Sequence, residues 1–138
     1  MKKSGFTLIE LLAVITLLAM IALIATPQVT KMITESKRDS FRSSAEGLME
    51  SAEQAYTEMQ YEKKITEVVE FNLTNGKNIE RLEVKGVGAS QGYININPSG
   101  FIEIAIYNEK YCAVKKYEDK KVKVFNLNNK DCTVDRME

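Results

Sequence analysis

The sequence predicts an α+β fold in which one long N-terminal α-helix packs on a C-terminal antiparallel β-sheet. Three observations support this prediction. Residues 6–26 form an almost uninterrupted apolar run, the apolar residues of 28–60 recur at three- and four-residue steps, and short alternating runs joined by turns follow from residue 61. We expect the first two stretches to form a single helix, half of it embedded in a membrane and half of it amphipathic.

The apolar run is long enough to cross a bilayer. At about 1.5 Å per residue, residues 6–26 make a helix of roughly 30 Å. The basic pair Lys2-Lys3 precedes the run, and Glu10 is the only charge within it. A carboxylate in the apolar layer costs at least about 2.5–3.5 kcal/mol, so such residues are usually paired and functional.

Three interpretations of this segment compete. A secretory signal peptide has a basic head and an apolar run, but no A-x-A cleavage site follows here. A plain single-pass anchor explains the length of the run but not the carboxylate of Glu10. A class III signal, which a peptidase cuts after Gly5 on the cytoplasmic side, leaves the apolar helix attached and accounts for both features.

The residues at this junction resemble the type IV prepilin signature, a basic leader followed by G-F-T-L-[IV]-E. The residues that carry the resemblance are Lys2, Lys3, Gly5, Phe6, Thr7, Leu8 and Glu10, with Pro27 placed as in that family. The resemblance in residues covers 2–27; the remainder is similar in layout only. It implies a pilin-like fold with a leader peptide at 1–5, a transmembrane and assembly helix at 6–27, an amphipathic helix of the head at 28–60 and a β-sheet part at 61–138.

The resemblance also implies a processing and assembly pathway. A prepilin peptidase would cut after Gly5, the new amine of Phe6 would be methylated, and a platform protein and an assembly ATPase would polymerise the chain with copies of itself. The precursor would sit in the cytoplasmic membrane with its N-terminus inside, and the product would reach the cell surface.

A physical role for Glu10 follows from this cut. Cleavage creates an α-amine on Phe6 that is cationic at neutral pH. If Glu10 faces the Phe6 amine of a neighbouring copy, each charge neutralises the other and the pairing fixes how far one subunit slides along the next. The simpler alternative is an acid near a helix end that reaches out to water. Pro27, further along, lacks a backbone donor and is expected to kink the helix.

The second half of the chain predicts an antiparallel meander. We expect one of its faces to be covered by the amphipathic helix and the other to be solvated. Strand-like runs stand at 65–73, 79–84, 93–97, 101–107, 111–117 and 122–127, with breaks at 74–77, 85–88, 98–100, 108–109 and near 118–120.

Cys112 and Cys132 are the only cysteines, and both lie in the part expected outside the membrane, where disulfides persist. A bridge between them would contribute roughly 3 kcal/mol and would pin the C-terminal tail to a strand. Two free thiols are the alternative, and the disulfide-bounded C-terminal loop common among pilins favours the bridge. With two cysteines and no histidine, we expect no metal site.

The composition argues against an enzyme and against a nucleic-acid binder. The chain has no histidine and no glycine-rich phosphate loop, and its 19 basic residues balance its 19 acidic ones. No cofactor is implied. We therefore expect a structural subunit, a pilin, of a type IV pilus or related filament. One alternative is a minor pilin or pseudopilin of a type II secretion or competence DNA-uptake system; another is a membrane-anchored binding module that does not polymerise.

Overall fold

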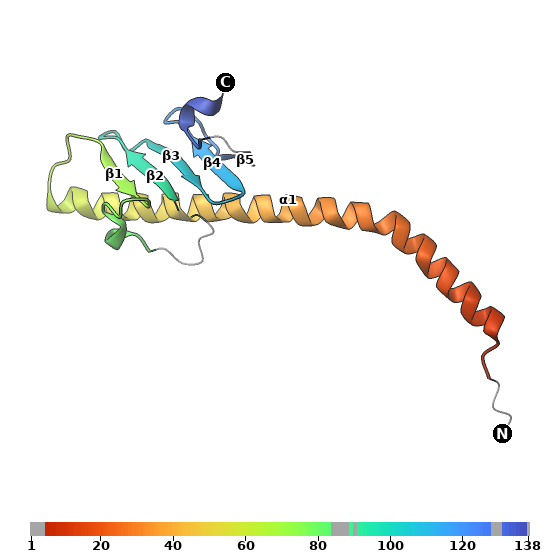
Figure 1. The fold of residues 1–138 in the computed structure, drawn as a ribbon. Coiled ribbons are helices and arrows are strands. Elements are labelled where there is room, and N and C mark those ends of the chain that lie inside the picture. The colour runs from red at the N-terminus through yellow and green to blue at the C-terminus, as the bar shows by residue number, and fades with distance from the viewer. Residues whose placement is uncertain (1–4, 84–88, 90, 128–130, 138) are drawn as a thin grey trace. The chain divides into compact units, whose positions relative to one another are not determined.

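The computed structural model describes residues 5–83, 89, 91–127 and 131–137. It consists of two compact units, Met1–Lys37 and Arg38–Glu138, which are treated separately below. The elements shown in Figure 1 are the helix α1 (Leu8–Glu62), the strands β1 (Val69–Asn72), β2 (Gln91–Ile96), β3 (Ile102–Tyr107), β4 (Tyr111–Lys115) and β5 (Lys123–Asn126), and the 3₁₀ turns η1 (Ile79–Arg81) and η2 (Val134–Met137). The predicted α+β class is confirmed.

In the first unit, α1 is helical without interruption and passes through Pro27. All side chains of residues 7–37 are exposed. The hydroxyl of Thr16 donates to the Ala13 carbonyl at 2.8 Å, and that of Thr26 donates to the Ala22 carbonyl at 2.6 Å. Each hydroxyl therefore has its hydrogen-bond acceptor within its own helix, as an apolar environment requires.

In the second unit, the sheet has the strand order β1-β2-β3-β4-β5, and every neighbouring pair is antiparallel. The predicted meander is confirmed. The run 79–84 was expected to be a strand, but its first residues form η1 instead. Ile79 and Leu82 stand three residues apart, and a 3₁₀ turn brings both onto the core, which an alternating strand would not do. The break expected at 85–88 lies outside the described residues.

The main core lies between α1 and the sheet. The buried residues of α1 recur at three- and four-residue steps and are Phe41, Ala45, Leu48, Ala52, Ala55 and Tyr56. Three of them are alanines, and each keeps 3% or less of its surface exposed. The Tyr56 hydroxyl donates to the Asn97 carbonyl at 3.1 Å, and the Phe41 ring lies 5.8 Å from that of Tyr111. The apolar stripe of α1 is thus buried only from Phe41 onwards; Val29, Met32 and Ile33 are exposed.

The opposite face of the sheet is not simply solvated, so that expectation is wrong for part of it. Ala105, Cys112 and Val114 are fully buried there, and Cys132 and Val134 of the C-terminal segment pack on them. A disulfide joins Cys112 to Cys132 with their Cα atoms 5.7 Å apart. The bridge therefore holds a second, smaller core over β3 and β4.

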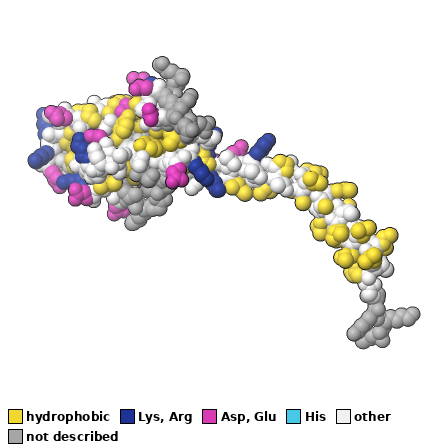
Figure 2. All heavy atoms as spheres, viewed as in Figure 1, with side chains coloured by type: hydrophobic (Ala, Val, Ile, Leu, Met, Phe, Trp, Pro, Cys, Tyr) yellow, Lys and Arg dark blue, Asp and Glu magenta, His cyan; other side chains and the backbone are white. Residues whose placement is uncertain are grey.

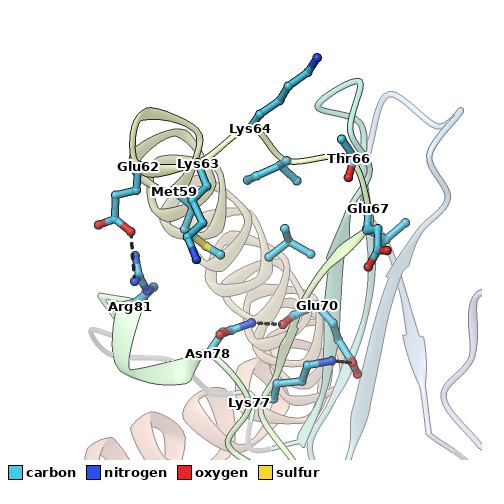
Figure 3. Close-up of a pocket in the computed structure, with 13 residues that line it drawn as sticks. Met59, Glu62, Lys63, Lys64, Thr66, Glu67, Glu70, Lys77, Asn78 and Arg81 are labelled. Atoms are coloured by element: carbon cyan, nitrogen blue, oxygen red, sulfur yellow. Dashed lines mark hydrogen bonds and ion pairs between the residues drawn. The ribbon is translucent and has the colours of Figure 1, made fainter.

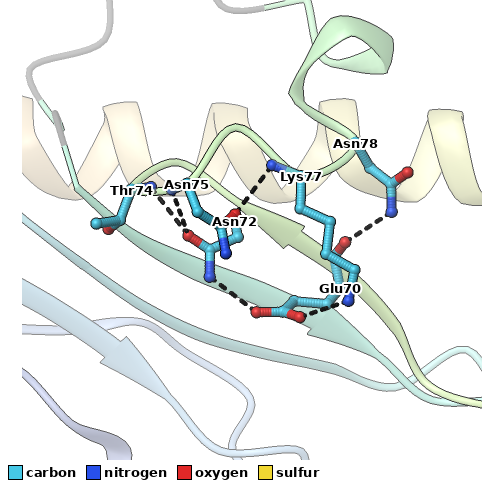
Figure 4. Close-up of polar contacts among 6 residues, drawn as sticks. All are labelled: Glu70, Asn72, Thr74, Asn75, Lys77 and Asn78. Carbon is cyan, nitrogen blue, oxygen red and sulfur yellow. Dashed lines mark hydrogen bonds and ion pairs between the residues drawn. The ribbon is translucent and has the colours of Figure 1, made fainter.

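A polar turn closes the outer edge of β1 (Figure 4). The Asn72 amide N–H donates to the Lys77 carbonyl at 2.9 Å, and Asn78 Nδ2 donates to the Glu70 carbonyl at 2.8 Å. Asn72 Oδ1 accepts the backbone N–H groups of Thr74 and Asn75, while its Nδ2 donates to Glu70. The turn satisfies backbone groups that an edge strand would otherwise expose to another chain.

Gly92 is the one strand glycine whose conformation the fold demands. Its φ is +121°, and a Cβ added there would overlap the Ala105 carbonyl and lie 2.6 Å from the Ile106 Cα. Its N–H donates to the Thr74 hydroxyl at 3.0 Å. Only a residue without a side chain fits this close approach of β2 to β3.

Lys115 at the end of β4 is buried, which its place in a charged stretch did not indicate. Its ammonium donates to the Ile102 carbonyl at 2.8 Å and to the Lys116 carbonyl at 3.3 Å. Burial lowers the pKa of this lysine, and the charge of Asp119 opposes that shift.

Candidate processing and assembly site

The helix start next to Gly5-Phe6 is a capping box. Thr7 precedes the first helical residue, Leu8, and its carbonyl accepts the Leu11 N–H at 3.2 Å. The Thr7 N–H donates to Glu10 Oε2 at 2.8 Å, and the Glu10 N–H donates to Thr7 Oγ1 at 3.4 Å. Two backbone donors that no helical carbonyl can reach are thereby satisfied reciprocally.

This geometry gives Glu10 a partner within its own chain, which the sequence analysis did not foresee. The carboxylate folds back towards the helix start and lies against the amide of Thr7, one residue after Phe6. Its second oxygen, Oε1, accepts no hydrogen bond from the described residues. One carboxylate oxygen therefore fixes the side chain in place while the other remains available to a further donor.

Thr7 is the residue of this site to which sequence reasoning assigned no role. The signal was present, because a threonine followed three residues later by a glutamate and then an apolar run is the usual capping-box pattern. Thr7 and Glu10 also belong to the prepilin signature, so the sequence analysis interpreted them as part of a processing signal and missed the capping box.

Gly5 and Phe6 stand free of the fold. A Cβ added at Gly5 would meet no atom within 4 Å. The side chain of Phe6 is 81% exposed. Within the described residues, space for a side chain is therefore available at position 5, which is compatible with a requirement for glycine that comes from a molecule acting on this segment.

The apolar stretch of α1 after Glu10 is uncovered. Figure 2 shows hydrophobic side chains over the visible surface of this stretch, and all of its residues are exposed. By length and composition, α1 is the candidate membrane span among the described residues. Soluble proteins rarely expose a contiguous apolar surface of this kind, so the stretch requires lipid or other helices around it.

Comparison with protein families supplies the deciding observation. Residues 1–26 match the family described as the prokaryotic N-terminal methylation motif. The N-terminal segment is a class III prepilin signal. Neither curated proteins nor solved structures gave a match to the chain. The match therefore supports the type IV pilin family through the signal, and the head contributes only its α+β layout.

A prepilin signal together with an uncovered apolar helix fits a precursor anchored in the membrane and processed for assembly. The segment brings Gly5, Phe6, Thr7 and Glu10 into one short stretch. Cys112 and Cys132 belong to the other unit and hold the tail of the head, so they take no part in this site. Whether Pro27 kinks α1 stays a prediction.

The head also contains a surface pocket of about 450 Å³ at the C-terminal end of α1 (Figure 3). Its charges are nearly balanced, and two of its cations are already paired: Lys77 with Glu70 at 2.8 Å and Arg81 with Glu62 at 3.5 Å. Within the described ranges, no group of acidic residues and cysteines is placed to hold a metal ion. The pocket therefore offers no concentrated charge for a ligand.

Proposed function

We propose that this chain is a structural subunit, a pilin, of a type IV pilus or related filament. In this proposal a prepilin peptidase removes residues 1–5, the Phe6 amine is methylated, and α1 leaves the cytoplasmic membrane to pack with copies of itself. A platform protein and an ATPase drive this assembly. The filament then displays the heads at the cell surface.

The observation that carries the proposal is the combination at the start of α1. A peptidase can reach the Gly5-Phe6 bond because both residues are exposed and a Cβ added at Gly5 would meet no atom within 4 Å. The helix that begins two residues later is apolar and uncovered. An uncovered apolar helix suits lipid before assembly and neighbouring helices after it, so one surface serves both states.

Glu10 gives the assembly its register in this proposal. Its Oε1 accepts the Phe6 amine of an adjacent subunit, while Oε2 keeps the bond to its own Thr7 N–H. An ion pair in an apolar layer forms strongly, because leaving either charge alone there is costly. Subunits that meet out of register would leave both charges unpaired.

The test of processing is the variant Gly5→Leu in cells that contain the matching peptidase. Because a Cβ at Gly5 meets nothing, this variant should fold and insert normally but should accumulate as uncut precursor. Gly47→Ala is the matched control, since a Cβ there also meets nothing. Mass and N-terminal sequencing of the recovered protein provide the readout, and normal cleavage of Gly5→Leu would contradict the proposal.

The test of the filament is electron microscopy of cells that produce the wild-type chain, with antibodies against the head. Long labelled fibres are expected. A chain that is cut after Gly5 but labels no fibre would contradict a major pilin and would point to a minor pilin or pseudopilin. An uncut chain that stays in the membrane would point to an anchored binding module.

A further inference from the structure

The outer face of α1 in the head carries an acidic stripe, defined here as Glu46, Glu50 and Glu53. These residues are three and four positions apart, so they share one side of the helix. Glu50 stands two residues from both Leu48 and Ala52, which are buried, and therefore lies about 200° around the helix from each. All three glutamates are exposed and point away from the sheet.

The fold of one copy does not balance these charges. Residues 46–62 contain five glutamates and neither lysine nor arginine. Like charges at such spacings destabilise a helix. In the described part of the chain, none of the three stripe carboxylates forms an ion pair. A row of like charges that no opposite charge of the same molecule offsets is characteristic of a functional surface.

A surface of opposite sign lies between β4 and β5. Residues 115–123 contain five lysines and two acidic residues. Of the two acids, Asp119 already accepts the Lys116 N–H at 3.2 Å and lies 3.7 Å from the Lys123 ammonium. Lys120 and Lys121, which we call the lysine turn, are exposed and form no ion pair with any described residue.

Other basic residues of the head are already compensated nearby. Arg42 pairs with Asp39 at 2.8 Å on the same helix. Lys77 and Arg81 pair with glutamates at the pocket described above. Lys63 and Lys64 stand in a stretch that also contains Glu62 and Glu67. By comparison with these stretches, residues 115–123 carry three more basic than acidic residues, and the lysine turn is an exposed part of them.

We propose that the acidic stripe of one copy docks against the lysine turn of a second copy of this chain. The two surfaces belong to different sides of the head, because the stripe faces away from the sheet and the turn joins two of its strands. Such a contact is heterologous, so it leaves each copy with one used and one free surface and can repeat without closing. It deepens the proposed function, since it names a contact between heads in the filament.

The contact is predicted to depend on salt. Both surfaces are exposed to water, so their attraction falls off over a Debye length of about 8 Å at physiological ionic strength. Complementary charges of this kind select the partner and its orientation more than they add affinity. The apolar part of α1 would hold subunits together, and the stripe and turn would decide how the heads face each other.

The first test is cross-linking of the full-length wild-type chain with a carbodiimide, which joins a carboxylate directly to an amine. Cells or membranes containing equal amounts of ¹⁴N- and ¹⁵N-labelled chain are treated and digested. We expect mixed-isotope peptides that link residues 46–53 to Lys120 or Lys121, and fewer of them in high salt. Links confined to one isotope, or absent at these residues, would overturn the proposal.

The second test is a charge swap. Glu50→Lys with Glu53→Lys, and separately Lys120→Glu with Lys121→Glu, should each lower filament yield about tenfold or more, and the four substitutions together should restore it. Glu67→Lys with Glu80→Lys and Lys63→Glu with Lys64→Glu are the matched controls and should have little effect. Loss in the controls, or failure of the combination to rescue, would refute the contact.

The two tests separate this contact from the proposed function. Cross-links between stripe and turn without fibres would refute the filament but keep the contact between copies. Fibres that form without these cross-links, or that tolerate both reversals, would keep the filament and refute the contact.

Discussion

The capping role of Glu10 and its proposed role in assembly can be separated by a pair of substitutions. In the structure its Oε2 accepts the Thr7 N–H at 2.8 Å, which caps the helix. In the proposed filament its charge also pairs with the Phe6 amine of a neighbour. Glu10→Gln keeps an oxygen that can cap the helix but removes the charge. Glu10→Ala removes both.

The expected magnitudes differ enough to distinguish the roles. Loss of a helix cap costs about 0.5–2 kcal/mol, whereas leaving a charge unpaired in an apolar layer costs about 3–5 kcal/mol. Since each 1.4 kcal/mol is about a factor of ten, loss of the ion pair should lower filament formation roughly 100-fold or more. If pairing sets the register, Glu10→Gln and Glu10→Ala should fail alike.

The assay measures the processed-to-precursor ratio together with the mass of filaments sheared from cells. Both variants should insert and be cut, because the Gly5-Phe6 bond is untouched. Thr7→Ala is the control for capping: it removes the weaker 3.4 Å bond from the Glu10 N–H and keeps the charge, so it should lower filament yield only slightly. Co-expression of wild type with Glu10→Ala should restore part of the yield.

A wild-type filament yield from Glu10→Gln would refute the electrostatic reasoning. It would show that capping is the whole role of this residue and that apolar packing of Leu8, Leu11, Leu12 and Ile15 sets the register. A wild-type yield from Glu10→Ala as well would deny Glu10 any role in assembly.

Three further predictions concern the head, measured as thermal unfolding of the full chain in detergent. Reduction of Cys112–Cys132 should destabilise the head by about 3 kcal/mol, a fall in Tm of roughly 10–20 °C, and an unchanged Tm would contradict the constraint assigned to the bridge. Gly92→Ala should destabilise by about 2 kcal/mol or more, because its Cβ meets the backbone of β3 at a positive φ, and a near-native Tm would contradict that clash. Hydrogen bonds from Lys77 and then Asn72 lower the pKa of Glu70 below 4.5, so its stabilisation is present above that pH and is lost as the pH falls through the lower, folded-state pKa. Glu70→Gln should therefore be less stable than wild type near neutral pH by at most about 1 kcal/mol, and a difference that persists in strong acid would exclude this cause.

The elements of the fold could be predicted from the sequence wherever a period is clear. Three- and four-residue spacing indicated the part of α1 that carries Phe41, Leu48 and Tyr56, and strict alternation indicated β2 and β3. The run 79–84 was mispredicted because Leu82 and Val84 have the two-residue spacing of a strand, whereas Ile79 and Leu82 have the three-residue spacing of a 3₁₀ turn. Periodicity indicates which residues share a side of an element, but over six residues it cannot distinguish a strand from a 3₁₀ turn.

The residues of the candidate site lie close together in the sequence, so most of the site could be predicted from it. Gly5, Phe6 and Glu10 lie within six consecutive residues, so the resemblance to the prepilin signature could be recognised there and implied a cut and a paired charge. The capping bond between Thr7 and Glu10 is equally local, yet its meaning depends on where the helix begins, and the structure places that start at Leu8.

Only the tertiary structure decided what lies on each face of the head. Three features arise where strands or segments distant in the chain meet: the C-terminal segment that covers Ala105 and Val114, the buried ammonium of Lys115, and the need for glycine at position 92. Such contacts depend on the register of one strand against the next, which a pattern within a single strand does not specify. The sequence by itself determined the apolar helix and the N-terminal methylation motif that it belongs to, because both depend only on residues close together along the chain.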